Sequence, residues 1–110
     1  MGYRAVYDGW KADPEAFWLN AAAGIEWDTP PNHALNDAQA PYFEWFTETF
    51  VNTCFNAVDR HVLAGRGDQV AIIHDSPVTH SKREITYREL QTRVASLAGA
   101  LRAKGVQKGD

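Results

Sequence analysis

Cysteine is nearly absent from this sequence, in which Cys54 is the single thiol among 110 residues. One thiol excludes an intrachain disulfide, and such cysteine usage fits a reducing compartment such as the cytoplasm. Long apolar runs are also missing, since no stretch approaches the ~20 residues that a membrane-spanning helix needs. The N-terminus lacks the basic and then apolar layout of a signal peptide. We therefore expect a cytoplasmic chain with no membrane partner.

Positive charge is in the minority, because 11 Lys and Arg residues stand against 14 Asp and Glu, a net charge of -3. A nucleic-acid-binding surface needs clustered positive charge to displace counterions from phosphate, so we expect no nucleic-acid partner. Four cations share the last predicted helix, and we interpret them as a solvated helix face: Arg88, Arg93, Arg102 and Lys104. Hydrophobic residues make up 45% of the chain, which is typical of a single folded domain at this length.

Phosphate-binding glycine loops are missing as well, since neither G-x-x-x-x-G-K-[ST] nor G-x-G-x-x-G occurs. The four histidines do not show the spacing of a zinc site, and one cysteine supplies only one thiolate. Residues 66–68 read Arg-Gly-Asp, an integrin-recognition tripeptide that we interpret as chance in this chain. We therefore predict no metal-binding and no cofactor-binding residues here.

What the sequence does contain is a dense stretch at residues 52–62, NTCFNAVDRHV. Three apolar residues at i, i+3 and i+7 place one face of a helix against a core: Phe55, Val58 and Val62. Asn52 or Thr53 can cap the start of this helix, because a short polar side chain accepts from the free backbone N–H groups. Gly65 can close it in the left-handed conformation.

Asp59, Arg60 and His61 are the candidate catalytic residues of this helix. Neighbouring helix positions point about 100° apart, so the three cannot converge on one atom by themselves. We favour structural roles, in which Asp59 and Arg60 pair with neighbours and His61 interacts with the negative end of the helix dipole. Cys54 lies two turns from His61, too far for a nucleophile–base pair. We predict no catalytic residues, and a small enzyme built on these three remains an alternative.

The N-terminal third predicts helices. Residues 1–11 carry aromatic side chains at i, i+4 and i+7, which fits a short helix and, equally well, an extended arm. Residues 13–24 predict a helix in which Asp13 is the N-cap, Pro14 takes the first helical position and Gly24 ends it.

Extended structure is expected next. The double proline in residues 28–32 predicts a turn or linker, and residues 33–37 predict a short strand. Residues 42–46 and 49–52 are aromatic and β-branched, which predicts a β-hairpin. Thr47-Glu48 is poor chemistry for a two-residue turn, so we expect a longer or bulged loop there.

The C-terminal part predicts two strands and a helix. Residues 70–74 form a continuous apolar run, which predicts a buried strand, and residues 83–86 predict its antiparallel partner across a turn at 75–82. Thr86 and Glu89 form a capping box for the last helix, and Glu89 can pair with Arg93.

The last helix also carries an apolar stripe and a stop signal. The stripe runs at i, i+4, i+7 and i+11: Leu90, Val94, Leu97 and Leu101. Gly105 is placed at C′, and Val106 can contact Leu101 in a Schellman ending.

Several motifs together resemble AMP-forming short-chain acyl-CoA synthetases. NTCFNAVDRH, residues 52–61, resembles their N-x-x-Y-N-x-x-D-R-H signature, with Phe55 in place of the usual tyrosine. DPEAFW at 13–18 resembles their first helix, and Trp27 follows it. YREL at 87–90 and GVQKGD at 105–110 resemble the Y-x-E-L and G-V-x-x-G-D motifs that follow in the family's sequences. Residues 47–49 depart from the family, which often has glycines there. The string at 52–62 is most similar to the propionyl-CoA branch.

The resemblance implies an α+β N-terminal piece of the adenylate-forming fold, incomplete by itself. We expect an arm and first helix at 1–32, a hairpin and the NAVDRH helix at 33–65, and two strands and a final helix at 66–110. The parent would use ATP, magnesium and CoA to convert a short-chain carboxylate, propionate in preference to acetate, to acyl-CoA, AMP and pyrophosphate. The family's ATP loop and catalytic lysine lie beyond the region matched here.

The leading hypothesis from this resemblance is that the chain is the N-terminal structural segment of such a ligase, packed against the main adenylating domain of its own polypeptide and inactive alone. It could instead be a stand-alone interaction module that docks on a partner or self-associates, since the four tryptophans fit an interface as well as a core.

Overall fold

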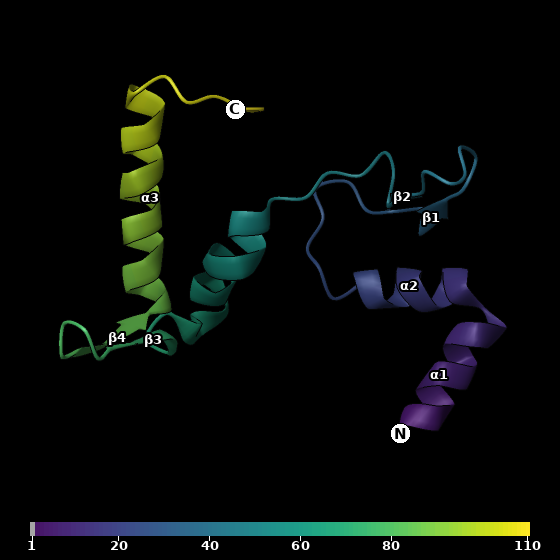
Figure 1. Cartoon of the computed structure of the whole chain (residues 1–110), viewed down its shortest axis with the longest axis horizontal. Helices are drawn as coiled ribbons and strands as arrows, with labels where there is room; N and C mark the ends of the chain where they lie inside the picture. The colour runs from purple at the N-terminus through teal and green to yellow at the C-terminus, as the bar shows by residue number, and fades with distance from the viewer. Residues whose placement is uncertain (1) are drawn as a thin grey trace. The chain divides into compact units, whose positions relative to one another are not determined.

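The computed structural model describes residues 2–110, which divide into two compact units, Met1–Asn52 and Thr53–Asp110. The elements are α1 (Tyr3–Ala12), α2 (Pro14–Ala22), β1 (Leu35–Asn36), β2 (Glu44–Trp45), η1 (Phe55–Asp59), η2 (Val62–Arg66), β3 (Val70–Ser76), β4 (Ser81–Thr86) and α3 (Tyr87–Ala103), as labelled in Figure 1. The helices and two small antiparallel sheets make an α+β chain, as expected. None of the helices within 2–110 is long and apolar enough to cross a bilayer.

The N-terminal unit begins with two consecutive helices. Residues 1–11 were open between helix and arm, and α1 settles them as helical over the described part. The predicted helix at 13–24 is confirmed as α2, where the Asp13 side chain accepts from Ala16 N at 2.9 Å and Pro14 is the first helical residue. The stop differs from the prediction, because Gly24 follows the end in a turn and is not among the glycines with positive φ.

The predicted hairpin between residues 42–46 and 49–52 is wrong. β2 pairs instead with β1, the short strand expected at 33–37, in the register Leu35 with Trp45. Phe50 bridges Thr29 further back in the chain. The reason is a tight turn after β2, in which Phe46 and Glu48 take positive φ and end the extended backbone.

Buried backbone and ring contacts hold the N-terminal unit together. Ala22 and Ala34 are its buried residues. The indole N–H of Trp27 donates to the Ala22 carbonyl at 2.8 Å, and the Ala34 N–H donates to Glu15 Oε1 at 2.7 Å. These bonds tie α2 to Trp27 and Ala34 in the segment that leads into β1, so this loop has a fixed path without a large core.

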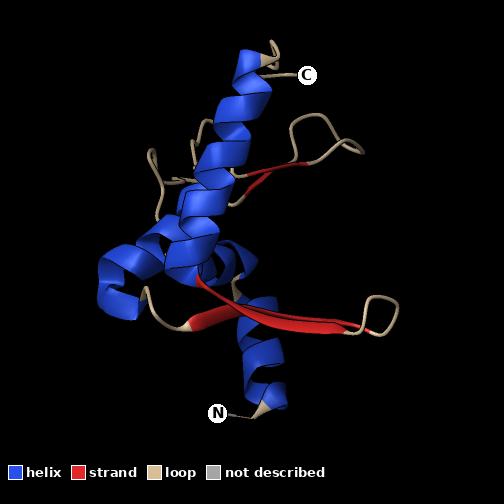
Figure 2. Ribbon diagram, turned by 90° about the vertical axis from the view of Figure 1, so that its left-hand side faces the viewer, coloured by secondary structure: helices blue, strands red, loops and turns tan. Residues whose placement is uncertain are grey.

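The C-terminal unit is built from one helical stretch, a hairpin and a long helix (Figure 2). Residues 53–66, here called the central helix, contain the two π-helical segments η1 and η2, and Arg60 N–H bonds Phe55 O five residues back. Val58 is buried while Phe55 and Val62 are half-buried, which confirms the predicted apolar face. Gly65 has φ 78°, the left-handed conformation expected of the closing glycine.

The strands predicted at 70–74 and 83–86 are confirmed as β3 and β4, which pair antiparallel. The prediction that the first is buried is wrong for this chain, since Ile73 is 63% exposed and its neighbour Ile72 is also exposed. β3 bonds β4 on one edge, and the described residues supply no strand to the other edge. The apolar run therefore predicted the strand correctly, but it did not predict that the strand would be exposed in this chain.

α3 begins and ends with the local signals expected of it. The Thr86 side chain accepts from Glu89 N at 3.2 Å, which confirms half of the capping box. The reciprocal half is replaced, because Glu89 Oε1 accepts from Arg83 at 2.5 Å and from Arg93 at 2.8 Å. Gly105 has φ 92°.

The backbone bonds at the end of α3 complete the Schellman motif. Val106 N donates to Leu101 O at 3.2 Å, and Gly105 N donates to Arg102 O at 3.0 Å. The predicted apolar stripe is covered unevenly, since Leu90 and Val94 are half-buried while Leu97 is 61% exposed.

Candidate functional site

The predicted candidates Asp59, Arg60 and His61 lie on the central helix, which packs against α3. Each of the three is half-buried. The Asp59 carboxylate accepts from Gln91 Nε2 on α3 at 2.7 Å. Arg60 Nη1 donates to Asn56 Oδ1 one turn back at 3.2 Å. These bonds are the neighbour pairings expected of structural residues.

His61 lies beside two other side chains. Its ring lies 4.6 Å from the Tyr87 ring, centroid to centroid, and Arg66 Nη2 lies within hydrogen-bond distance of its Nδ1. A guanidinium has only donors, so it pairs with the lone pair of a neutral imidazole. Partial burial, then Arg66, then Arg60 lower the pKa of His61. Burial and the two guanidinium groups thus favour the neutral ring, which opposes the expected interaction of His61 with the negative end of the helix dipole.

Lowering the pH is expected to destabilise the C-terminal unit through His61. Its folded pKa lies below the ordinary 6.5, so the unfolded chain binds more protons as the pH falls through that value, and the folded state loses stability. Urea denaturation at pH values from about 7.5 to 5.5 measures this loss. His61→Gln should flatten the dependence, whereas the exposed His74→Gln should leave it unchanged. An equal slope in wild type and His61→Gln would contradict the assignment.

The Arg-Gly-Asp tripeptide at 66–68 is part of a folded turn beside this region. The Gly67 carbonyl accepts from Arg88 N at 2.9 Å, and Arg88 Nε contacts Asp68 Oδ1 at 3.3 Å. Gly67 is buried, and a Cβ there would lie 2.6 Å from Arg88 Nη2. A glycine fits because the guanidinium lies over it. Two of the four predicted surface cations, Arg88 and Arg93, are paired with carboxylates.

The three candidate side chains face different neighbours, which limits the chemistry that they can perform together. Asp59, Arg60 and His61 turn to Gln91, Asn56 and the Tyr87–Arg66 pair, so the structure does not bring them together on one point. Cys54 is exposed at the start of the same helix. Within residues 2–110, no group of three His, Cys, Asp or Glu side chains could hold a metal ion.

Two partners in this region were not singled out as such by the sequence. Gln91 lies 32 positions from Asp59, and no spacing pattern in the sequence marks Tyr87 as a neighbour of His61. β4 runs directly into α3, and the described contacts place α3 against the central helix. The crossing of the two helices could not be read from spacing within either one.

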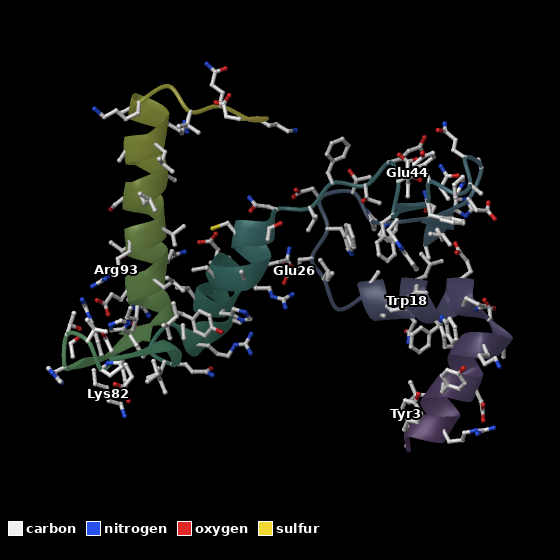
Figure 3. All side chains as sticks on the ribbon, viewed as in Figure 1. Tyr3, Trp18, Glu26, Glu44, Lys82 and Arg93 are labelled. Atoms are coloured by element: carbon white, nitrogen blue, oxygen red, sulfur yellow. The ribbon has the colours of Figure 1, made fainter. Side chains whose placement is uncertain are left out.

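The N-terminal unit holds a second candidate, a groove of about 530 Å³ that the sequence did not predict. Three tryptophans line it together with Pro14 and Leu35: Trp10, Trp18 and Trp45. Trp18 and Trp45 meet edge to face with ring centroids 5.4 Å apart, and Trp18 is labelled on α2 in Figure 3. Glu15 and Asp37 are the two acidic residues that line the groove.

Comparison with known proteins identifies a family that matches this sequence. Residues 3–57 match the family described as "Acetyl-coenzyme A synthetase N-terminus". The chain belongs to this family. The match covers all of the N-terminal unit from Tyr3 onward and the first residues of the central helix. The resemblance to AMP-forming acyl-CoA synthetases is thereby confirmed.

Individual relatives match well beyond the family region. The chain is 45% identical over 108 residues to the bovine (Bos taurus) protein "Acyl-CoA synthetase short-chain family member 3, mitochondrial", covering 98% of this chain and 16% of the relative. It is 43% identical over 105 residues to "Acetyl-coenzyme A synthetase" of Streptomyces avermitilis, covering 96% of this chain and 16% of the relative. The chain thus spans a small part of the length of the curated relatives that it matches.

Proposed function

We propose that this chain serves as a non-catalytic N-terminal segment of an acid–CoA ligase. Its relatives are named as acyl-CoA and acetyl-CoA synthetases, and the match runs over nearly the whole chain. The single observation that carries the structural role is the divergence of Asp59, Arg60 and His61, each of which binds a different neighbour. A segment that uses its polar residues for internal bonds offers none of them to a substrate.

The reaction proposed for the parent has two steps. A short-chain carboxylate attacks ATP to give an acyl-adenylate and pyrophosphate, and the thiol of CoA then displaces AMP to give acyl-CoA. Magnesium would accompany ATP and offset phosphate charge. The groups that bind ATP, magnesium and CoA would lie in the main adenylating domain, which we propose as the partner of this segment. The proposed compartment is the cytoplasm, with no membrane or nucleic-acid partner.

Propionate is the proposed substrate, and acetate is the alternative. The string NTCFNAVDRHV at 52–62 favours the propionyl-CoA branch. The family description and the Streptomyces relative favour acetate, because both name acetyl-coenzyme A. The two acids differ by one methylene, which changes transition-state binding by about 1–3 kcal/mol in a hydrophobic pocket.

AMP release tests both parts of this proposal. The purified 110-residue chain, given ATP, magnesium, CoA and either acid, is expected to form no AMP above the buffer control. The polypeptide that carries this sequence in its source cells, isolated with an antibody against the chain, is expected to form AMP faster with propionate than with acetate. AMP formation that rises with the concentration of the 110-residue chain would contradict the structural role.

A stand-alone interaction module is the second candidate, and the tryptophan groove favours it. The native mass separates the two candidates. A polypeptide several times larger than 12.3 kDa would support the ligase segment. A polypeptide of 12.3 kDa would support the module. Self-association of the free chain would then be the first interaction to test.

A further inference from the structure

We infer that the groove between α1, α2 and the β1–β2 hairpin binds a protein segment through an arginine or lysine side chain. Trp10, Trp18 and Trp45 line the groove. A cation over an indole face is attracted by the ring's negative face, and tryptophan is the best of the aromatic side chains for this contact.

The carboxyl groups in the groove differ in their availability. Glu15 Oε1 accepts from Ala34 N at 2.7 Å and lies 3.6 Å from His33 Nδ1, so it holds the wall in place. The Asp37 side chain forms no hydrogen bond or ion pair with any other described residue, although its backbone carbonyl accepts from Ala40 N. Asp37 therefore brings an uncompensated negative charge to an aromatic groove.

That charge discriminates among occupants. A purely apolar segment would remove water from the Asp37 carboxylate without forming a hydrogen bond to it, which costs free energy. An acidic segment would be repelled. An arginine can donate two parallel N–H bonds to the carboxylate and stack its guanidinium on an indole, so one side chain satisfies both features of the groove.

The N-terminal unit cannot supply this cation from its own sequence. Residues 1–52 carry eight acidic and two basic side chains, a formal net charge of -6. Arg4 is paired with Asp8 at 3.1 Å, and Lys11 Nζ lies 5.5 Å from the centre of the Tyr7 ring. Neither basic residue lines the groove. The charge of the whole unit thus favours a basic partner, whatever reaction the parent performs.

A series of three peptides tests the inference on the 110-residue chain. The probes are acetyl-Gly-Leu-Xaa-Leu-Gly-amide, in which Xaa is arginine, citrulline or glutamate. Citrulline keeps the shape of arginine and removes its charge. We expect the arginine peptide to bind at least about tenfold more tightly than the citrulline peptide and the glutamate peptide not to bind.

The indole N–H signals in two-dimensional NMR locate the binding. Trp10, Trp18 and Trp45 should shift with the arginine peptide. Trp27 should not shift, because it does not line this groove and its N–H is bonded to Ala22 O. Shifts confined to Trp27, or equal affinity for arginine and citrulline, would overturn the inference.

Asp37→Asn supplies the variant and Asp28→Asn its matched control. Both remove one carboxylate charge from an exposed position of the same unit, but Asp28 is outside the groove. We expect Asp37→Asn to weaken the arginine peptide about tenfold and Asp28→Asn to weaken it less than twofold. Light scattering without peptide tests whether a second copy of this chain occupies the groove. A dimer that Asp37→Asn dissociates would assign the groove to a second copy and overturn the inference.

Discussion

Replacing Val58 with alanine is expected to lower the free energy of unfolding of the C-terminal unit by about 2 kcal/mol. Val58 is 7% exposed and is the buried hydrophobic residue of the central helix. Alanine leaves a cavity where two methyl groups were, and the helix keeps its shape because alanine is a good helix former. The loss therefore reports packing. Urea denaturation followed by far-ultraviolet circular dichroism measures it.

Leu63→Ala is the matched control for this prediction. Leu63 lies in the same helical stretch but is 75% exposed, so its truncation should change stability by less than about 0.5 kcal/mol. If both variants lose the same stability, the apolar face of the central helix would not be organised around Val58. The comparison holds the helix and the type of change constant and varies burial.

Local signals of helix boundaries were predictable from the sequence. Asp13, Thr86 and Gly105 each act through a bond to a backbone group within four residues, as the observed caps show. Such bonds depend on the identity of one side chain and the chain's own path, not on distant packing. The apolar face around Val58 was predictable for the same reason, because it rests on spacing within a single helix.

Pairing between segments was less predictable. The residues at 42–52 have high strand propensity, but propensity does not name a partner. Non-glycine positive φ at Phe46 and Glu48 turns the chain after β2, and nothing in the residue types announces it. Trp45 consequently pairs with Leu35 on the other side of a loop. The groove was missed because it joins three segments whose aromatic residues had equally good roles in a core.

In the candidate site, too, local geometry was predictable from the sequence and contacts between segments were not. Adjacent positions on a helix were sufficient to predict that Asp59, Arg60 and His61 would diverge. The environment of His61 was not predictable in the same way, because Arg66 approaches the ring across the kink at Gly65. The helix dipole favours a cation there, whereas burial and the nearby guanidinium groups lower the pKa of His61 and favour the neutral ring.

Gln91→Leu is expected to cost about 2 kcal/mol of stability, because it leaves the half-buried Asp59 carboxylate without its donor. The double variant Asp59→Leu with Gln91→Leu should recover most of that loss, since both polar groups are removed together. Urea denaturation of the four members of this cycle measures the coupling. Gln107→Leu, the same change at an exposed position, should be close to neutral.

Asp59→Asn in the longer polypeptide that we propose as the parent ligase separates a structural role from a catalytic one. The asparagine side-chain oxygen can still accept from Gln91, so stability should fall by less than about 1 kcal/mol. If Asp59 only joins the central helix to α3, the rate of AMP formation per folded molecule should remain near that of the wild type. If the carboxylate acts as a base or binds a reacting group, the rate should fall by a factor of about 100 or more while the fold persists. Retained activity together with a positive coupling energy between Asp59 and Gln91 would show that the most catalytic-looking residue of this sequence serves to hold two helices together.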